Sequence, residues 1–228
     1  MILQHVPALN AKRIILASAS PRRRELLGNI GLKFEVMVST FEETLPKHRF
    51  SYGGEYALET ARHKALDVAA MCAQPGPGEV GGAPPRAVDM IISADTVVEA
   101  NGEILEKPDD AEHAFRMISS LSGKEHQVHT GVVLLLPGVA DPATGSPPLI
   151  RTFVATTDVT FDSLPDEAIR AYIATGEPYG KAGSYGIQGA AGAFVVGLKG
   201  CYHTVMGFPL HRFTKEVAAL IEEGLLKL

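Results

Sequence analysis

The chain has 228 residues, 46% of them hydrophobic and 21% charged, which is enough for a sizeable core and typical of globular proteins. Its net charge of -5 argues against general binding of nucleic acid, which needs a broad basic surface. Cys72 and Cys201 are its only cysteines, so a disulfide framework or zinc site is not expected. Because no apolar run reaches membrane-spanning length and no leader-like segment opens the chain, we expect a cytoplasmic protein without a membrane partner.

The first predicted elements are a short buried strand over 14–17 and a helix that begins at Pro21, with Ser20 as its N-cap. The three arginines of 22–24 therefore fall in the first helical turn, where the backbone N–H groups already carry partial positive charge. An anion bound there would stabilise this arrangement, since helix N-termini and guanidinium groups both suit phosphate. A basic surface turn is the alternative. The strand-Ser-Pro-Arg context favours a polyphosphate-binding turn.

Two adjacent carboxylates, Glu42 and Glu43, follow a predicted half-buried strand over 33–38. Together with Asp95 they could hold a divalent cation, because hard cations prefer oxygen ligands. Adjacent glutamates are also common on protein surfaces, so a purely solvated pair is the alternative.

Asp95 lies in the apolar run 88–98, which predicts a strand. A lone buried charge is costly, so this carboxylate either faces a cleft or has a dedicated partner. A strand-end aspartate that bonds the nearby backbone is an equally good interpretation of the local sequence. Thr96 could offer its hydroxyl to a base or phosphate, or could simply favour the strand. Asn101-Gly102 then predicts a two-residue hairpin turn.

The remaining segments mix helices and strands with no repeat and no interdomain linker, which predicts one domain over 1–228 with a mixed sheet, of the α/β or α+β class. The expected strands are 103–107, 127–136, 151–161 and 194–196. The expected helices are 54–73, one opening on an Asp109–Glu112 capping box and reaching Leu121, one capped by 163–166 and ending near Thr175, and one over 210–225. Surface loops are expected at 74–85 and 137–148, and a glycine-rich segment at 176–200.

Three further side chains suit a polyphosphate or a base, although each alone is an ordinary surface residue. Lys107 follows a strand end, Lys181 lies in a glycine-rich turn, and the Gln188 amide can both donate and accept hydrogen bonds. His126 and His129 are expected on opposite strand faces, which disfavours a shared metal. The sequence lacks a Walker A motif, a dinucleotide fingerprint and a nucleophile elbow. The remaining candidates are the arginine- and serine-containing turn, the lysines, the carboxylates and the glutamine segment. Together they suit attack of water on a metal-bound polyphosphate.

Several motifs in one order resemble the Maf family of nucleoside triphosphate pyrophosphatases, which is distantly related in fold to inosine triphosphate pyrophosphatases. They are LASASPRRRELL, ETARHKA, ISADTVV, ILEKP, LSGKEHQVHTG, GKAGSYGIQG and VMGFPL, and they cover nearly the whole chain. The resemblance implies an elongated α/β fold with a mixed sheet, two lobes flanking a cleft, and often a homodimer. It also implies conversion of a nucleoside triphosphate to the monophosphate and pyrophosphate with Mg²⁺ or Mn²⁺.

The resemblance implies that Asp95 activates water and that Glu42, Glu43 and Asp95 serve the metal. The motif Gly186-Ile-Gln-Gly189 resembles the version found in the subgroup of this family that acts on dTTP and UTP. The alternatives are a nucleotide-binding regulator of cell division with little turnover and a house-cleaning enzyme for modified nucleotides. The residues that the resemblance implies for substrate binding are Ser18, Arg22, Arg23, Lys64, Thr96, Lys107, Lys181 and Gln188, of which Arg22, Thr96 and Gln188 match positions associated with base selectivity.

Overall fold

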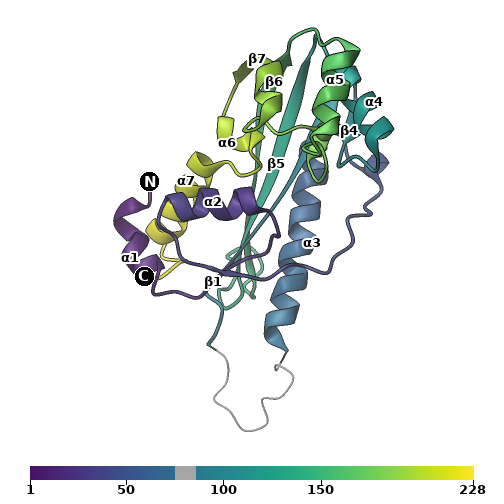
Figure 1. Cartoon of the computed structure of the whole chain (residues 1–228). Coiled ribbons are helices and arrows are strands. Elements are labelled where there is room, and N and C mark those ends of the chain that lie inside the picture. The colour runs from purple at the N-terminus through teal and green to yellow at the C-terminus, as the bar shows by residue number, and fades with distance from the viewer. Residues whose placement is uncertain (75–85) are drawn as a thin grey trace.

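A computed structural model describes residues 1–74 and 86–228, so the predicted loop 74–85 lies, except for Gln74, outside the described residues. The described strands form one seven-stranded sheet in the order β2-β1-β3-β5-β6-β7, with β4 paired to β3 (Figure 1). The β1 strand runs parallel to β2 and β3, and the other pairs are antiparallel. The predicted mixed α/β sheet is therefore confirmed. The strands are β1 (Ile14–Leu16), β2 (Glu35–Val36), β3 (Met90–Ala100), β4 (Glu103–Leu105), β5 (Glu125–Leu136), β6 (Leu149–Phe161) and β7 (Val195–Lys199).

Helices cover both faces of this sheet. No helix of the described residues is long and apolar enough to cross a membrane. The α-helices in the described ranges are α1 (Val6–Leu9), α2 (Pro21–Asn29), α3 (Gly53–Ala73), α4 (Ala111–Leu121), α5 (Asp166–Ala174), α6 (Tyr202–Val205) and α7 (Leu210–Glu222), and the 3₁₀ segments are η1 (Leu3–His5), η2 (Lys47–Arg49), η3 (Ala182–Ser184) and η4 (Ala190–Phe194).

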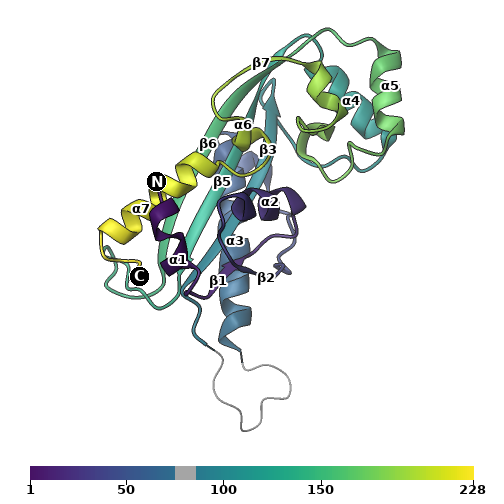
Figure 2. The ribbon, with the colours of Figure 1, turned by 60° about the vertical axis from the view of Figure 1, so that its left-hand side comes forward.

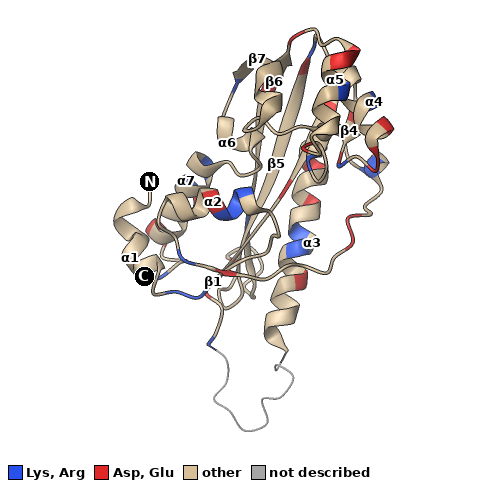
Figure 3. Ribbon diagram, in the orientation of Figure 1, with Lys and Arg blue, Asp and Glu red and all other residues tan. Residues whose placement is uncertain are grey.

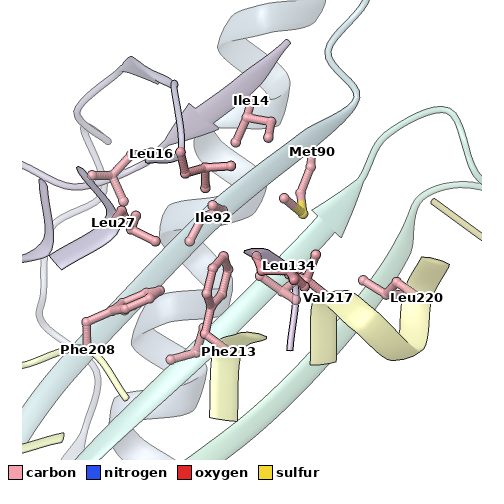
Figure 4. Packing of buried hydrophobic residues seen from close by; sticks show 14 of the residues in the cluster. Ile14, Leu16, Leu27, Met90, Ile92, Leu134, Phe208, Phe213, Val217 and Leu220 are labelled. Atoms are coloured by element: carbon pink, nitrogen blue, oxygen red, sulfur yellow. The ribbon is translucent and has the colours of Figure 1, made fainter. Parts of the chain in front are cut away.

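One face of the sheet carries two separate apolar cores, which define the two lobes seen in Figure 2. The first core packs α2 and α7 against β1, β3 and β5, with Phe208 and Phe213 at its centre (Figure 4). The second packs α4 and α5 against the far ends of β3, β5 and β6. Along β3 the first core ends at Ala94 and the second begins at Val98. Thr96 therefore marks a polar break between the lobes.

The opposite face is covered by α3, which runs along the sheet (Figure 1). Its closest approach is at Gly131 of β5, where an added Cβ would overlap the backbone of Leu58. Glycine is thus required there because the helix backbone lies directly on the strand. Gly131 pairs in register with Asp95, so this close approach brings α3 over that carboxylate.

One edge of β3 is left open between two partners. The β1 strand pairs with residues 90–92 and β4 with residues 98–100, whereas β5 occupies the other edge along 91–99. The stretch 93–97 therefore faces a gap between β1 and β4. This gap, together with the break between the two cores, places the central residues of β3 at a cleft.

Most predicted elements are confirmed, including the hairpin, where Asn101 and Gly102 take φ angles of 52° and 77°. Both residues are in the left-handed region, as a type I′ turn requires. The predicted strand 33–38 is reduced to Glu35–Val36, and both residues are exposed. Because β2 is an edge strand, only one of its sides is paired.

Two predicted helix caps are wrong, and a third, Ser20, is correct in position only. Ser20 precedes α2 as expected, but its side chain makes no capping bond. The cap of α4 is Asp110 instead of Asp109, since the Asp110 carboxylate accepts the N–H of His113 at 2.7 Å. Helix α5 begins after Pro165 without a side-chain cap, so Ser163 has no capping role. Patterns of this kind locate a helix start within one or two residues, whereas side-chain geometry decides the cap.

Candidate active site

A cavity of about 410 Å³ lies at the cleft between the two cores. Ten of the eleven site residues predicted from the sequence line it, and Glu42, which is exposed, does not. The lining residues also include Phe41, Tyr185 and Gly207, which the sequence analysis missed. The ten predicted residues at the cavity are Ser18, Arg22, Arg23, Glu43, Lys64, Asp95, Thr96, Lys107, Lys181 and Gln188.

Arg23 and Lys64 are both only 9% exposed, but Arg23 differs from Lys64 in having neutral hydrogen-bond partners. Its Nε donates to the Gly207 carbonyl at 2.8 Å, Nη1 donates to Ser18 Oγ at 3.0 Å, and Nη2 donates to Thr96 Oγ1 at 3.1 Å. All three acceptors are neutral, and no carboxylate of the described residues lies within 4.0 Å of the guanidinium. Burial lowers its pKa, an effect that the nearby Asp95 charge opposes. A buried charge with neutral partners indicates a site for an anion.

The other two arginines of the turn differ from Arg23. Arg22 is half-buried and donates from Nε to the Met206 carbonyl at 3.3 Å, and burial lowers its pKa. Arg24 is exposed and does not line the cavity. Helix α2 thus turns two of its three first-turn arginines toward the cleft.

Lys64 joins the two carboxylates of the cavity. Its Nζ lies 2.8 Å from Asp95 Oδ1 and 2.7 Å from Glu43 Oε1. Lys107 approaches Glu43 from the other side, at 3.3 Å from Oε2. Helix α3, the end of β4 and the segment after β2 therefore meet in one ion-pair network. The sequence left open whether the Asp95 carboxylate faces a cleft or has a dedicated partner. In the structure it does both, since it lines the cavity and pairs with Lys64.

Burial acts in the same direction on the two carboxylates, but the net result differs. Burial raises the pKa of Asp95 and outweighs the lowering effect of Lys64 and Arg23. Burial also raises the pKa of Glu43, but the two ammonium groups of Lys64 and Lys107 hold that pKa below its ordinary value. Asp95 is therefore the better proton acceptor of the two, and Glu43 remains ionised.

The lining of the cavity is positively charged although the chain as a whole is acidic. Five cations, Arg22, Arg23, Lys64, Lys107 and Lys181, face two carboxylates, Glu43 and Asp95, which leaves an excess of three positive charges in a chain of net charge -5. Figure 3 shows basic segments on α2 and α3 in this part of the molecule. Such a concentration of positive charge favours a polyanionic ligand.

A chain of three threonines lies beneath Arg23. Thr96 Oγ1 is 2.9 Å from Thr130 Oγ1, and Thr130 donates to the Thr204 carbonyl at 3.0 Å. Thr96 and Thr130 pair in register on β3 and β5, at the break between the cores. The sequence analysis missed Thr130, because only the strand register reveals that it supports Thr96.

The glycine-rich segment forms the outer rim of the cavity. Gln188 is exposed there, and Lys181 donates from Nζ to the Glu177 carbonyl. Burial lowers the pKa of Lys181, and the positive charge of Arg22 adds to this effect. Tyr185 is 5% exposed and its hydroxyl lies 2.8 Å from His126 Nε2.

The two histidines of β5 lie on opposite faces of the sheet, as their spacing predicts. His126 packs against Phe161 and Tyr185 in the second core. His129 lies at the start of α3, where its Nε2 is 3.2 Å from Glu99 Oε2. They do not meet in a common site.

The donors at the cavity fit a divalent cation that also contacts the substrate. Within residues 1–74 and 86–228, no cluster of three or more His, Cys, Asp or Glu side chains is suited to a metal ion. Glu43 and Asp95 nevertheless line the same cavity and share Lys64. Mg²⁺ commonly takes one or two carboxylates and completes its shell with water and phosphate oxygens. Glu42 lies outside this pair, so its role at the metal stays a prediction.

The fold and this site define a cleft suited to a polyanionic ligand, and comparison with known proteins shows the family. The model of the Maf family, described as Maf-like protein, matches residues 13–220, and the chain belongs to this family. A human relative named "Probable bifunctional dTTP/UTP pyrophosphatase/methyltransferase protein" is 44% identical over 209 residues, which cover 92% of this chain and 32% of that protein. The chain thus spans about a third of the human relative.

Bacterial relatives match over most of their own length. A Clostridium perfringens protein named "dTTP/UTP pyrophosphatase" is 41% identical over 89% of this chain and 94% of its own. A Shigella sonnei protein of the same name is 44% identical over 86% of this chain and 87% of its own.

Proposed function

We propose that the protein is a nucleoside triphosphate pyrophosphatase that hydrolyses dTTP and UTP to the monophosphate and pyrophosphate. The observation that carries this proposal is the buried, unpaired charge of Arg23 beside Asp95 among the described residues, in a cavity with excess positive charge. The names of the bacterial relatives support the substrates. They do not favour a cell-division regulator with little turnover.

In this proposal Asp95 is the base. Only its Oδ1 has a hydrogen-bond donor within the described residues, which leaves Oδ2 for a water molecule. As that water attacks the α-phosphorus, its proton passes to Asp95 and the bond from the α-phosphorus to the α,β-bridging oxygen breaks. Pyrophosphate leaves and the monophosphate remains. The raised pKa of Asp95 makes it a stronger base than an exposed aspartate.

The cations would bind and orient the polyphosphate. Arg23 uses three N–H groups on protein acceptors and has two more for phosphate oxygens. Lys107, which is 58% exposed, can follow the leaving pyrophosphate. Fixed positive groups aimed at the developing charge lower the barrier because they need no reorganisation during the reaction.

Glu43 and Asp95 would hold a divalent metal, Mg²⁺ or Mn²⁺. When bound, such an ion neutralises phosphate charge and polarises the phosphorus centre. Arg22, Thr96 and Gln188 would contact the base side of the nucleotide. Uracil and thymine present two carbonyl acceptors and one N–H donor, which an amide such as that of Gln188 can match.

The test is a panel of nucleoside triphosphates, including modified pyrimidine nucleotides, assayed with Mg²⁺ and with Mn²⁺ for monophosphate and pyrophosphate. We expect the highest kcat/KM for UTP and dTTP. Release of single phosphates would contradict the cleavage position. Tight binding of every nucleotide without turnover would favour the regulator, and a strong preference for a modified nucleotide would favour a house-cleaning role.

A further inference from the structure

The segment that carries Gln188 is fastened at both ends by one chain of hydrogen bonds. The Gly186 N–H donates to Tyr172 Oη at 3.3 Å, and the Tyr172 hydroxyl donates to Glu177 Oε1 at 3.1 Å. The other carboxylate oxygen, Glu177 Oε2, accepts the Ala190 N–H at 3.0 Å. The backbone two residues after Gln188 therefore bonds the Glu177 carboxylate directly, and the backbone two residues before it bonds that carboxylate through the Tyr172 hydroxyl.

We propose that Glu177 is a positioning residue for base selection, which holds Gln188 at the angle needed to meet the nucleobase. This inference rests on the proposed function. It assigns to Glu177 no contact with the nucleotide, because its carboxylate is engaged with Tyr172 and Ala190.

The packing around Glu177 shows how tightly the segment lies on it. A Cβ at Gly189 would overlap the Glu177 carboxylate, and a Cβ at Gly186 would come within 2.7 Å of Lys181 Cε. The two glycines that flank Ile187-Gln188 are thus in contact with the side chains below them. With glycine at both positions, the segment lies directly on these two side chains without displacing them.

Glu177 is itself held in place. Its N–H donates to Thr175 Oγ1 at 3.1 Å, and its carbonyl accepts from Lys181 Nζ. Its partner Tyr172 is 4% exposed, and burial together with the Glu177 charge raises the pKa of that hydroxyl. The tyrosine therefore stays protonated and donates to the carboxylate at neutral pH.

A carboxylate at this position gives both donors, the Tyr172 hydroxyl and the Ala190 N–H, a charged acceptor oxygen. Glutamine has the same shape but is neutral and has one acceptor oxygen, so with that oxygen on Ala190 its NH₂ group would donate to the Tyr172 hydroxyl, which would then turn its own hydrogen away. Glu177→Gln therefore replaces two charge-assisted hydrogen bonds with weaker neutral ones and reorients the Tyr172 hydroxyl, with little change in volume.

The experiment compares Glu177→Gln with the wild type for UTP, dTTP, CTP and GTP, and measures inhibition by inorganic tripolyphosphate. We expect the kcat/KM ratio of UTP to CTP to fall about five- to tenfold, as replacement of charge-assisted hydrogen bonds by neutral ones predicts, mainly through KM. Inhibition by tripolyphosphate, which has no base, should not change. Tyr172→Phe breaks the same chain at its other member and should act in the same direction. Glu167→Gln, an exposed carboxylate on α5, is the matched control.

A double variant tests whether Glu177 affects base selection through Gln188. If Glu177 acts through Gln188, Glu177→Gln should add no further loss of selectivity in a Gln188→Ala background. An unchanged UTP to CTP ratio in Glu177→Gln and Tyr172→Phe would overturn the inference and leave the proposed function standing. An additive loss in the double variant would overturn it too. A wild-type protein that releases no pyrophosphate from any nucleotide would instead overturn the proposed function, on which the inference depends.

Discussion

The cavity has two sides that are built in different ways. The inner wall consists of Arg23, Lys64, Asp95 and Thr96, which stand on α2, α3 and β3. The glycine-rich rim, residues 181–190, consists of short turns and 3₁₀ segments, with Gln188 exposed. Each charge of the inner wall contacts another element, whereas the rim depends on hydrogen bonds to its backbone. Reaction chemistry needs charges at fixed separations, and selectivity can be set by a separate segment.

The largest expected effect comes from the centre of the inner wall. Asp95→Asn keeps the shape of the side chain but removes the base, so kcat should fall about 10³-fold, as general-base catalysis predicts. Without added divalent metal, the Kd of a non-hydrolysable UTP analogue should change little, because the cationic side chains remain. Steady-state release of pyrophosphate and titration calorimetry provide the two values. Undiminished turnover would refute the assignment of the base.

The second variant tests the electrostatics of the same wall. Lys64 lowers the pKa of Asp95, against the larger effect of burial, so Lys64→Met should raise that pKa further. Because Asp95 acts in its ionised form, the acid limb of kcat should move to higher pH, by about one unit or more. The pH profile of kcat measures this shift. Arg62→Met, an exposed neighbour on α3, is the control and should leave the limb in place.

The third prediction concerns the support of the rim, where His126 binds Tyr185. Burial lowers the pKa of His126 from 6.5 to about 4. Between these values the unfolded chain binds more protons than the folded one, so the stabilisation is complete above pH 6.5 and is lost as the pH falls toward 4. One proton changes the free energy of unfolding by at most about 1.4 kcal/mol per pH unit.

Urea unfolding at a series of pH values measures this slope. His126→Phe should flatten the slope, and His48→Gln, which alters an exposed histidine, should preserve it. An equally steep slope in His126→Phe would show that the acid sensitivity arises from other groups.

The smallest effect is expected at the edge of the rim. Gln188→Glu replaces an amide that donates and accepts with a group that only accepts, so the preference for UTP and dTTP should drop about tenfold or invert. Because Gln188 is exposed, the melting temperature should stay within about 1 °C. The kcat/KM values for the four bases measure the change. If UTP and dTTP keep the same margin, Gln188 does not contact the base.

The sequence predicted the helices and strands better than the side-chain contacts between them. Apolar runs identified β3 and β5, and the unbroken helical pattern identified α3 within one residue of its start. The pairing of Lys64 with Asp95 spans 31 positions, and that of Arg23 with the Gly207 carbonyl spans 184. Local patterns contain no information about such contacts, which the strand order creates.

The candidate site was predicted from the resemblance more than from the residues alone. For Asp95, local sequence left a cleft and a backbone contact equally open. The gap along 93–97 decides between them, and it exists because β1 ends and β4 begins on the same edge of β3. Glu42 and Glu43 are adjacent residues of the same type, so the sequence cannot tell which one faces the site. Only Glu43 lines the cavity, because successive side chains point in different directions.

The threonine chain beneath Arg23 also fixes where hydrogen atoms point. Thr130 gives its single hydroxyl hydrogen to the Thr204 carbonyl, so it must accept from Thr96. Thr96 in turn receives Arg23 Nη2, and its own hydrogen goes to Thr130 at 2.9 Å, which is closer than the Gly207 carbonyl at 3.5 Å. One lone pair remains on the Thr96 oxygen. Any group that meets Thr96 in the cavity must therefore bring a hydrogen of its own, which makes this position a polarity filter for its ligand.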